Sequence, residues 1–310
     1  MTATTTDRVL ALDEVAELSI GPVAVALGVF DGVHRGHRYL LSATREAAAA
    51  RDAQPVALVF DPPPIEVIRP DHAVERLAPL AENLEHIAAA GVRPIAVRFD
   101  PAVRDLPPEV FLDRLGPGLR PVAIAMTADS SFGKSRAGTP ERLTEIGAQR
   151  GFEVVIVQLE SDDGVISSSR IRLALGDGEV EAAQRLLGRL PAVTGTVVRG
   201  DGRGRELGYP TANLAFGYRL ALPALGIYAG WAIGQPALIS VGRRPVFHTD
   251  GDIVFEAHLL DWDGDLYDQE LRVEVATRLR EEREFASVQD LIEQMKRDES
   301  DARAALRGTV

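Results

Sequence analysis

Short apolar runs alternate with helix-like segments through the first half of the chain. The first run, residues 23–30, is continuous and contains β-branched residues, which is typical of a strand covered on both faces. The other runs predict four more strands, and the segments between them predict helices: strands at 55–60, 94–99, 121–126 and 154–159, and helices at 38–51 and near 81–90, 108–115 and 140–150. Strands that alternate with helices predict an α/β fold with a doubly wound parallel sheet.

The turn after the first strand is a candidate phosphate site. It contains His34 and His37, with Gly36 between them, beside the predicted start of a helix. Ligands of doubly wound sheets bind beyond the carboxyl ends of the strands, where helix amides attract anions. The two imidazoles could therefore hold nucleotide phosphates and stabilise charge on a transferred nucleotidyl group. The alternative is a pair of turn histidines, one of them a helix cap. A metal centre would need a further carboxylate or histidine, and the sequence presents no second cluster.

A glycine-rich stretch from Val198 to Leu214 dominates the second half. Its glycines would let the backbone approach an anion closely, while arginines and free amides face that anion. The hydroxyl of Thr211 and the side-chain carbonyl of Asn213 are hard oxygen ligands suited to Mg²⁺. The alternative is a glycine-rich surface turn between strands. The phosphate-binding candidates in this stretch are Gly200, Gly202, Arg203, Gly204 and Gly208.

Two apolar runs follow the glycine-rich stretch and predict strands. The first, 223–230, is entered through a turn, and the second, 254–260, carries the single acid Glu256 among apolar neighbours. That setting favours an acid that faces a site, although strand alternation could turn it outward into solvent. Between the halves, 179–187 predicts a helix and 188–191 a linker. We therefore predict two domains, 1–187 and 188–310.

The composition is that of a soluble globular protein of 310 residues, 45% hydrophobic and 26% charged. The net charge of −12 argues against binding to nucleic acid or to an anionic membrane, so the expected partners are small molecules; oligomerisation stays open. The absence of cysteine excludes disulfides, thiolate metal sites and cysteine nucleophiles. Residues 1–13 are polar, which predicts no signal peptide or membrane anchor and a cytoplasmic location.

The second half resembles the riboflavin kinase family. The shared motifs are the glycine-rich loop, Pro-Thr-Ala-Asn at 210–213, Gly-Ile-Tyr-Ala-Gly at 226–230 and Glu-Ala-His-Leu at 256–259. The resemblance implies a small antiparallel β-barrel closed by a helix from Ser287 to about Leu306. It also implies transfer of the γ-phosphoryl group of ATP to the 5′-hydroxyl of riboflavin. In that reaction Thr211 and Asn213 would hold Mg²⁺ and Glu256 would accept the hydroxyl proton.

The first half resembles the nucleotidylyltransferases marked by His-x-Gly-His, in particular the FMN adenylyltransferase half of bacterial FAD synthetases. Residues 28–37, Gly-Val-Phe-Asp-Gly-Val-His-Arg-Gly-His, match the family's first motif, and 166–172, Ile-Ser-Ser-Ser-Arg-Ile-Arg, match its last. The resemblance implies a Rossmann-like fold and transfer of AMP from ATP to FMN with release of pyrophosphate. It implies catalytic roles for His34, His37 and Arg172, and nucleotide binding by Gly28, Phe30, Asp31, Gly36, Asp129, Ser168 and Ser169. A serine-capped surface helix is the alternative for the last motif.

Three segments depart from the family patterns. Pro63 stands where the family has histidine, and 127–131 lacks a glycine, a glutamate and an aromatic residue. Arg243 and Arg244 stand where the kinase family has Thr-Asn. A proline can neither donate a hydrogen bond nor exchange a proton, so the first two departures predict an adenylyl transfer that is weak, respecified or absent, against the ordinary activity. Two alternatives to a bifunctional enzyme follow: a kinase with a degenerate first domain, and a nucleotidyltransferase that acts on another phosphorylated acceptor.

Overall fold

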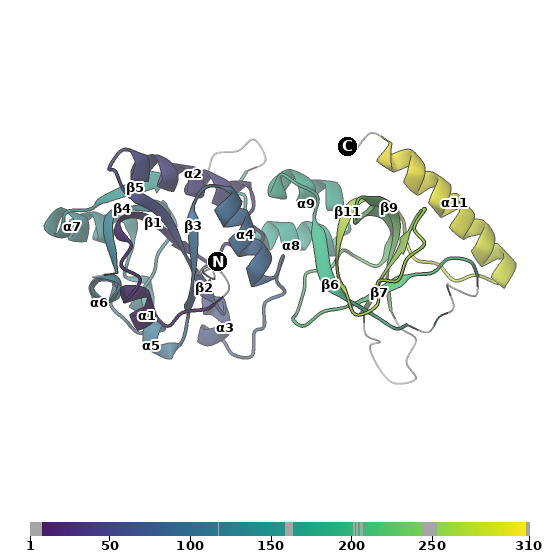
Figure 1. The fold of residues 1–310 in the computed structure, drawn as a ribbon, viewed down its shortest axis with the longest axis horizontal. Coiled ribbons are helices and arrows are strands. Elements are labelled where there is room, and N and C mark those ends of the chain that lie inside the picture. The colour runs from purple at the N-terminus through teal and green to yellow at the C-terminus, as the bar shows by residue number, and fades with distance from the viewer. Residues whose placement is uncertain are drawn as a thin grey trace. The chain divides into compact units, whose positions relative to one another are not determined.

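The computed structural model describes residues 8–116, 118–158, 164–200, 202, 204, 207–243 and 253–307. Within these residues the chain divides into two compact units. The first consists of Met1–Val74 with Pro79–Ser167, and the second of Glu75–Ala78 with Ser168–Val310. Figure 1 shows a layered α/β structure in the first unit and a barrel in the second. Each unit has its own core, so each is described separately.

The first unit is built on a five-stranded parallel sheet with strand order β3-β2-β1-β4-β5. This arrangement confirms the predicted doubly wound parallel sheet. The strands are β1 (Gly21–Gly28), β2 (Gln54–Asp61), β3 (Arg93–Arg98), β4 (Leu119–Thr127) and β5 (Glu153–Val157). The helices are α1 (Leu12–Ala16), α2 (Arg35–Ala49), α3 (Pro64–Ile68), α4 (Leu80–Ala89), α5 (Pro101–Arg104), α6 (Pro108–Leu115) and α7 (Pro140–Arg150), with a 3₁₀ turn, η2, at Lys134–Arg136.

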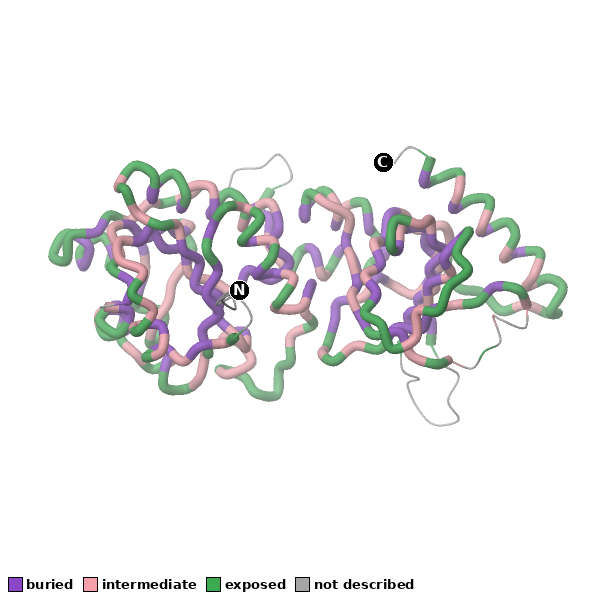
Figure 2. The backbone as a smooth tube through the Cα atoms, in the orientation of Figure 1, coloured by how far each residue is buried: buried purple, intermediate pink, exposed green. Residues whose placement is uncertain are grey.

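Both faces of the sheet are buried, as the continuous apolar runs predicted. Side chains alternate along β1, so Val23 and Val25 pack with α1, α6 and α7 on one face, while Ala26 packs towards α2 and α4 on the other. Figure 2 shows the strands as the buried layer of this unit. β1 ends at Gly28, two residues before the apolar run does, because Phe30 leaves the strand with a positive φ of 53°. α2 begins at Arg35, three residues before the predicted start.

The second unit contains a closed antiparallel barrel with strand order β10-β7-β6-β11-β8-β9, which confirms the predicted barrel. The strands are β6 (Ala192–Val198), β7 (Ala212–Ala215), β8 (Gly226–Ala232), β9 (Gln235–Arg243), β10 (Ile253–Leu259) and β11 (Glu270–Arg280). The helices are α8 (Ser168–Gly176), α9 (Val180–Leu187) and α11 (Val288–Leu306). α9 packs against β11. Closure pairs each of these six strands with a neighbour on both sides.

The carboxyl-terminal helix α11 covers one side of the barrel. It packs against β8, β9 and β11, with Ala302 and Leu306 in a core cluster that also contains Ala229 and Leu238. Ser287 caps the helix by accepting a hydrogen bond from the Asp290 amide at 3.1 Å. The helix predicted from Ser287 to about Leu306 is therefore confirmed. Among the helices in the described ranges, none is long and apolar enough to cross a membrane.

Candidate active sites

The turn between β1 and α2 is held in a strained conformation. Phe30 and Val33 have positive φ values of 53° and 34°, which are unfavourable for residues with a Cβ. Phe30 is buried, and the Gly32 amide donates to Oδ1 of the buried Asn83 on α4 at 2.9 Å. These contacts offset the backbone strain and hold the turn against the sheet. Strain of this kind clusters at functional sites, so the turn is a candidate site for a second, structural reason.

His34 and His37 lie against each other in this turn. Their rings stack with centroids 3.7 Å apart and planes 14° apart. Nδ1 of His34 accepts a hydrogen bond from the His37 amide at 3.2 Å, so His34 caps α2. Because Nδ1 is the acceptor, a neutral His34 ring carries its hydrogen on Nε2. The predicted helix cap is therefore present together with the paired imidazoles.

The His37 ring is buried in surroundings that disfavour its charged form. Its Nδ1 is buried without a hydrogen-bond partner in the described residues. Burial lowers the pKa of His37 well below its usual range, and the neighbouring His34 ring lowers it further. An unpartnered imidazole nitrogen can donate to a phosphate oxygen once it is protonated. A bound phosphate would favour that protonated form because it supplies the missing opposite charge.

Small or buried residues surround the two histidines. A Cβ added to Gly36 would lie 3.1 Å from Cε1 of His34, and one added to Gly28 would lie 3.3 Å from the Phe30 ring. The centroid of that ring is 5.2 Å from the centroid of His37, and Asp31 is buried in the same turn. The structure thus brings the candidate residues of the first motif together in one turn.

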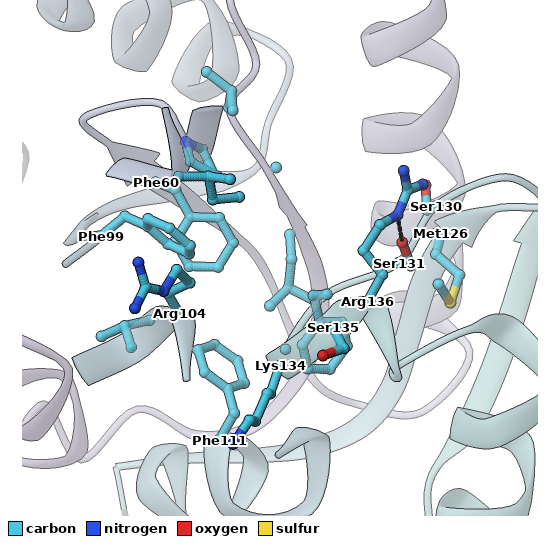
Figure 3. A pocket seen from close by; sticks show the side chains of 18 of the residues that line it. Phe60, Phe99, Arg104, Phe111, Met126, Ser130, Ser131, Lys134, Ser135 and Arg136 are labelled. Carbon is cyan, nitrogen blue, oxygen red and sulfur yellow. Dashed lines mark hydrogen bonds between the residues drawn. The ribbon is translucent and has the colours of Figure 1, made fainter. Parts of the chain in front are cut away.

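A cavity of about 770 Å³ opens at the carboxyl ends of the parallel strands. Its lining includes Gly28 from β1, Phe60 from β2, Met126 from β4 and Phe99, which follows β3. This is the edge at which ligands of doubly wound sheets bind. Figure 3 shows Phe60, Phe99 and Phe111 gathered on one side of the cavity. Ring centroids are 5.4 Å apart for Phe60 and Phe99 and 6.1 Å apart for Phe60 and Phe111. An aromatic wall of this kind suits a flat ring system.

The rim of this cavity is polar and includes the segment that departs from the family pattern. Oγ1 of Thr127 donates to Oδ1 of Asp129 at 2.7 Å, and the hydroxyls of Thr127 and Ser130 also hydrogen-bond. Arg136 donates to Oγ of Ser131 at 2.7 Å (Figure 3). The predicted residue Asp129 lines the cavity, as do the cations Arg104, Lys134 and Arg136. Sequence reasoning missed the wall of phenylalanines: Phe60 and Phe99 lie at or just after strand ends, but Phe111 lies within α6.

The last adenylyltransferase motif crosses the division between the units: Ile166 and Ser167 belong to the first, and the residues from Ser168 onward belong to the second. Ser168 and Ser169 are the first residues of α8, so a helix begins at this motif. Arg172, one turn into the helix, donates from Nε to the Glu75 carbonyl at 2.5 Å. His34 and His37 belong to the first unit. Joint action of these two groups on one nucleotide stays a prediction.

In the barrel, strand register brings Asn213 and Glu256 side by side. The two residues are directly opposite each other in the antiparallel pair β7–β10. Nδ2 of the buried Asn213 donates to Oγ1 of Thr211 at 3.4 Å, so the two side chains lie next to each other. Glu256 is half-buried, and all three residues line a cavity of about 480 Å³.

The glycine-rich loop passes close to these residues. A Cβ on Gly200 would lie 2.6 Å from Nδ2 of Asn213, and a Cβ on Gly204 would lie 2.4 Å from the Tyr209 carbonyl oxygen. Gly202 and Gly208 have φ values of 75° and 85°, a conformation that L-residues rarely adopt. At each of these four positions, glycine is therefore favoured either by a close contact or by a positive φ. The predicted phosphate contact Arg203 lies outside the described residues.

Two further cavities adjoin the first one in the barrel unit. One, of about 680 Å³, is lined by Arg199, Trp262 and Tyr267, with the Arg199 guanidinium 5.2 Å above the Tyr267 ring centroid. The other, of about 200 Å³, is lined by Gly200, Gly202 and Asn213. Thr211 lines all three cavities. It therefore stands where ligands bound in separate cavities would meet.

Charged groups from β11 and α11 form the other wall of the 480 Å³ cavity, and sequence reasoning did not identify them. Arg280 donates through Nε and Nη2 to both oxygens of the buried Asp298, at 2.9 and 2.7 Å. Gln294 donates to the same carboxylate at 2.7 Å. Burial raises the pKa of Glu282, although Arg280 opposes the shift. Arg243, at the end of β9, also lines this cavity, and Arg244 lies outside the described residues.

No group of three or more His, Cys, Asp or Glu side chains within the described ranges could hold a metal ion. The barrel site offers a hydroxyl and an amide oxygen instead. These ligands fit Mg²⁺, which prefers oxygen ligands and is usually completed by water and substrate phosphates. A Mg²⁺ ion at Thr211 and Asn213 would therefore depend on a bound nucleotide for its remaining ligands.

Comparison with known proteins gives a consistent result over both units. The family model for FAD synthetase matches residues 18–170, and the model for riboflavin kinase matches residues 187–306. The chain is 37% identical to the bifunctional riboflavin kinase/FMN adenylyltransferase of Escherichia coli K12 over 90% of this chain and 91% of the relative. The corresponding protein of Pseudomonas fluorescens is 36% identical, with the same coverage.

Among solved structures, a crystal structure described as a macrolide-efflux protein from Streptococcus pneumoniae superposes with a TM-score of 0.85 and 31% identity. It covers 95% of this chain, and this chain covers 98% of it. The identities to the bifunctional enzymes hold over nine-tenths of the chain, and the two family models match in the same order as the parallel sheet and the barrel. The chain belongs to the family of bifunctional riboflavin kinase/FMN adenylyltransferases.

Proposed function

We propose that this chain phosphorylates riboflavin to FMN with ATP and then joins FMN to the AMP part of ATP, producing FAD and pyrophosphate. Adenylyl transfer is assigned to residues 1–187 and phosphorylation to residues 188–310. The observation that carries the proposal is the position of Thr211, which borders three cavities next to Asn213 and Glu256. Phosphoryl transfer needs such a meeting point, because donor and acceptor must approach in line.

In the kinase step, riboflavin would occupy the 480 Å³ cavity, where Glu256 can accept the proton of the 5′-hydroxyl. ATP would occupy the cavities beside Arg199 and Tyr267, with its phosphates along Gly200, Gly202, Gly204 and Gly208 and near Arg203. The riboflavin oxygen then attacks the γ-phosphorus, the bond to the bridging oxygen breaks, and ADP leaves. Mg²⁺, held by Thr211 and Asn213, would supply charge neutralisation at the phosphates.

In the adenylylation step, the flavin ring of FMN would lie against the aromatic wall of the 770 Å³ cavity. A phosphate oxygen of FMN attacks the α-phosphorus of ATP, the α–β bridge breaks, and pyrophosphate leaves. No protein nucleophile takes part. His34 and His37 would stabilise the phosphate charge, with Gly28, Phe30, Asp31 and Gly36 shaping their turn and Asp129 at the cavity rim. Ser168, Ser169 and Arg172 are assigned to the triphosphate on their sequence motif alone.

The departures at Pro63 and 127–131 are interpreted in this proposal as tolerated variation. The stacked histidines and the aromatic cavity support the bifunctional reaction over a kinase alone. The expected cytoplasmic location and the oligomeric state stay predictions.

The proposal is tested by incubating the purified chain with riboflavin, Mg²⁺ and each of ATP, CTP and GTP, and identifying the products by mass. FMN together with FAD from ATP is the expected result. FMN alone, or a flavin dinucleotide formed only from another nucleotide, would mean that Pro63 and 127–131 change the first site. Absence of every flavin product would overturn the kinase assignment as well.

A further inference from the structure

We infer that His258 is a positioning residue for the metal-binding segment of the kinase site. The side chain is half-buried, lines the 480 Å³ cavity and comes from β10, two residues after Glu256. Its Nδ1 lies 2.7 Å from the carbonyl oxygen of Pro210. A carbonyl oxygen can only accept a hydrogen bond, so Nδ1 must carry the hydrogen and donate it. The inference rests on the proposed kinase function.

The bond lies where the backbone ladder between β7 and β10 stops. The paired residues are Phe255 with Leu214, Glu256 with Asn213 and Ala257 with Ala212, so the next pair along would be His258 with Thr211. β7 begins only at Ala212, and Pro210, on the far side of Thr211, has no N–H to donate. The imidazole of His258 therefore connects the two segments beyond the end of the ladder.

This connection fixes the peptide unit that carries Thr211. The carbonyl of Pro210 and the amide of Thr211 belong to the same planar group, so holding the carbonyl oxygen orients that group. On the other side, the Tyr209 amide donates to the Gly204 carbonyl at 2.8 Å, and the Tyr209 ring meets His258 edge-on with centroids 5.3 Å apart. Thr211 is thereby held between the glycine-rich loop, His258 and the start of β7.

The position of Thr211 matters because its hydroxyl is a proposed ligand of Mg²⁺. A Mg²⁺ ion demands near-ideal octahedral geometry, so small shifts of a ligand oxygen weaken its binding. Residues that orient metal ligands without touching the metal typically change metal affinity or activity by about 10- to 100-fold when they are replaced. His258 has the same relation to Thr211: it touches the backbone next to the ligand.

Two substitutions separate the Nδ1–H bond from the bulk of the ring. In His258→Asn, the side-chain amide group can occupy the place of Nδ1 and donate to Pro210. In His258→Gln, the amide lies one bond further out and does not reproduce that donor position. Both variants lose the ring contact with Tyr209. We expect His258→Gln to bind Mn²⁺ in the presence of ADP about 10-fold more weakly than the parent. We expect His258→Asn to stay within about 3-fold of the parent, since it keeps the donor.

The experiment measures Mn²⁺ binding to the full chain with ADP by electron paramagnetic resonance, and the Mg²⁺ concentration that gives half-maximal FMN formation. Circular dichroism melting shows that each variant is folded. Weaker Mn²⁺ binding in His258→Gln together with near-parental binding in His258→Asn supports the inference. Equal Mn²⁺ binding in the parent and His258→Gln, or an equal loss in His258→Asn and His258→Gln, overturns it. The Mn²⁺ comparison decides the question even if the parent makes no FMN, an outcome that would overturn the proposed function alone.

Discussion

The two candidate sites are built in different ways. In the barrel, Asn213 and Glu256 meet because two antiparallel strands pair in register, and each residue keeps ordinary strand geometry. In the parallel-sheet unit, His34 and His37 meet because a turn with positive φ at Phe30 and Val33 leads into α2. The first site thus depends on the ladder and on close backbone contacts. The second depends on a strained turn that buried neighbours hold in place. Substitutions in one site should therefore lower the activity assigned to that site and leave the other activity unchanged.

The largest effect is expected from Glu256→Gln. Replacing the only acid on β10 with an amide removes the group that would accept the hydroxyl proton, so FMN formation should fall by about 10²- to 10⁴-fold. Formation of FAD from supplied FMN should stay at the parent rate. Both rates are measured by chromatography of the products. The matched control is Glu270→Gln on β11, which changes the same charge away from the cavity. A Glu256 variant with parental FMN formation would rule this residue out as the base.

For His37→Ala we expect the opposite result: FAD formation should fall while FMN formation is retained. Loss of one member of the stacked pair should reduce FAD formation from FMN and ATP by about 10²- to 10³-fold, the range seen when one stabilising donor is removed from a transition state. FMN formation from riboflavin should be unchanged. His86→Ala, on α4 and paired with Glu82, is the control histidine. If His37→Ala still made FAD at the parent rate, the assignment of the first site would be wrong.

A smaller effect is expected when the backbone of the barrel site is crowded. Gly200→Ala places a Cβ about 2.6 Å from Nδ2 of Asn213, so the Asn213 side chain must leave its present position next to Thr211. Misplacing a ligand in this way should lower FMN formation by roughly 10- to 100-fold and raise the Mg²⁺ requirement, with adenylyl transfer unaffected. Gly217→Ala is the control, because its Cβ would meet no atom within 4 Å. Parental kinetics in Gly200→Ala would show that this close approach does not matter.

The contrast between the sites also explains what the sequence could predict. Continuous apolar runs were enough to predict the parallel sheet, because β1 is buried on both faces. They did not decide the orientation of Glu256, which alternates with the buried Phe255 and Ala257 and is itself half-buried. The glycine-rich loop could be interpreted because each of its glycines lies at a close contact or has a positive φ. The phenylalanine wall could not be predicted. Phe60, Phe99 and Phe111 look like ordinary core residues in the sequence and meet only when three separate segments reach one edge of the sheet.

Two other features could not be predicted from the sequence, for related reasons. The positive φ of Phe30 belongs to a residue type that normally avoids that conformation, so no local signal announces it. The Arg280–Asp298 pair joins β11 to the middle of α11, where a charged residue on a polar helix predicts only a solvated face. Both depend on tertiary packing, which overrides local preference.

The smallest expected effect concerns the pH dependence of the strained turn. The pKa of His37 is lowered in the folded chain, so below about pH 6.5, the ordinary histidine value, the unfolded state binds more protons. The stability that a neutral His37 contributes is therefore present above this pH and is lost as the pH falls. When the pH is lowered from 7.5 to 5.5, the free energy of opening α2 should fall by about 1 kcal/mol more in the parent than in His37→Gln, because glutamine does not titrate.

Hydrogen exchange of the α2 amides in parent and variant at both pH values measures this difference directly, because intrinsic exchange rates cancel at matched pH. His34 is stacked on His37, so the double difference reports the titration of the pair and not of one ring. His86→Gln leaves both rings in place and should keep the parental pH dependence. Identical pH dependence in the parent and His37→Gln would show that the stacked pair imposes no charge penalty on the turn.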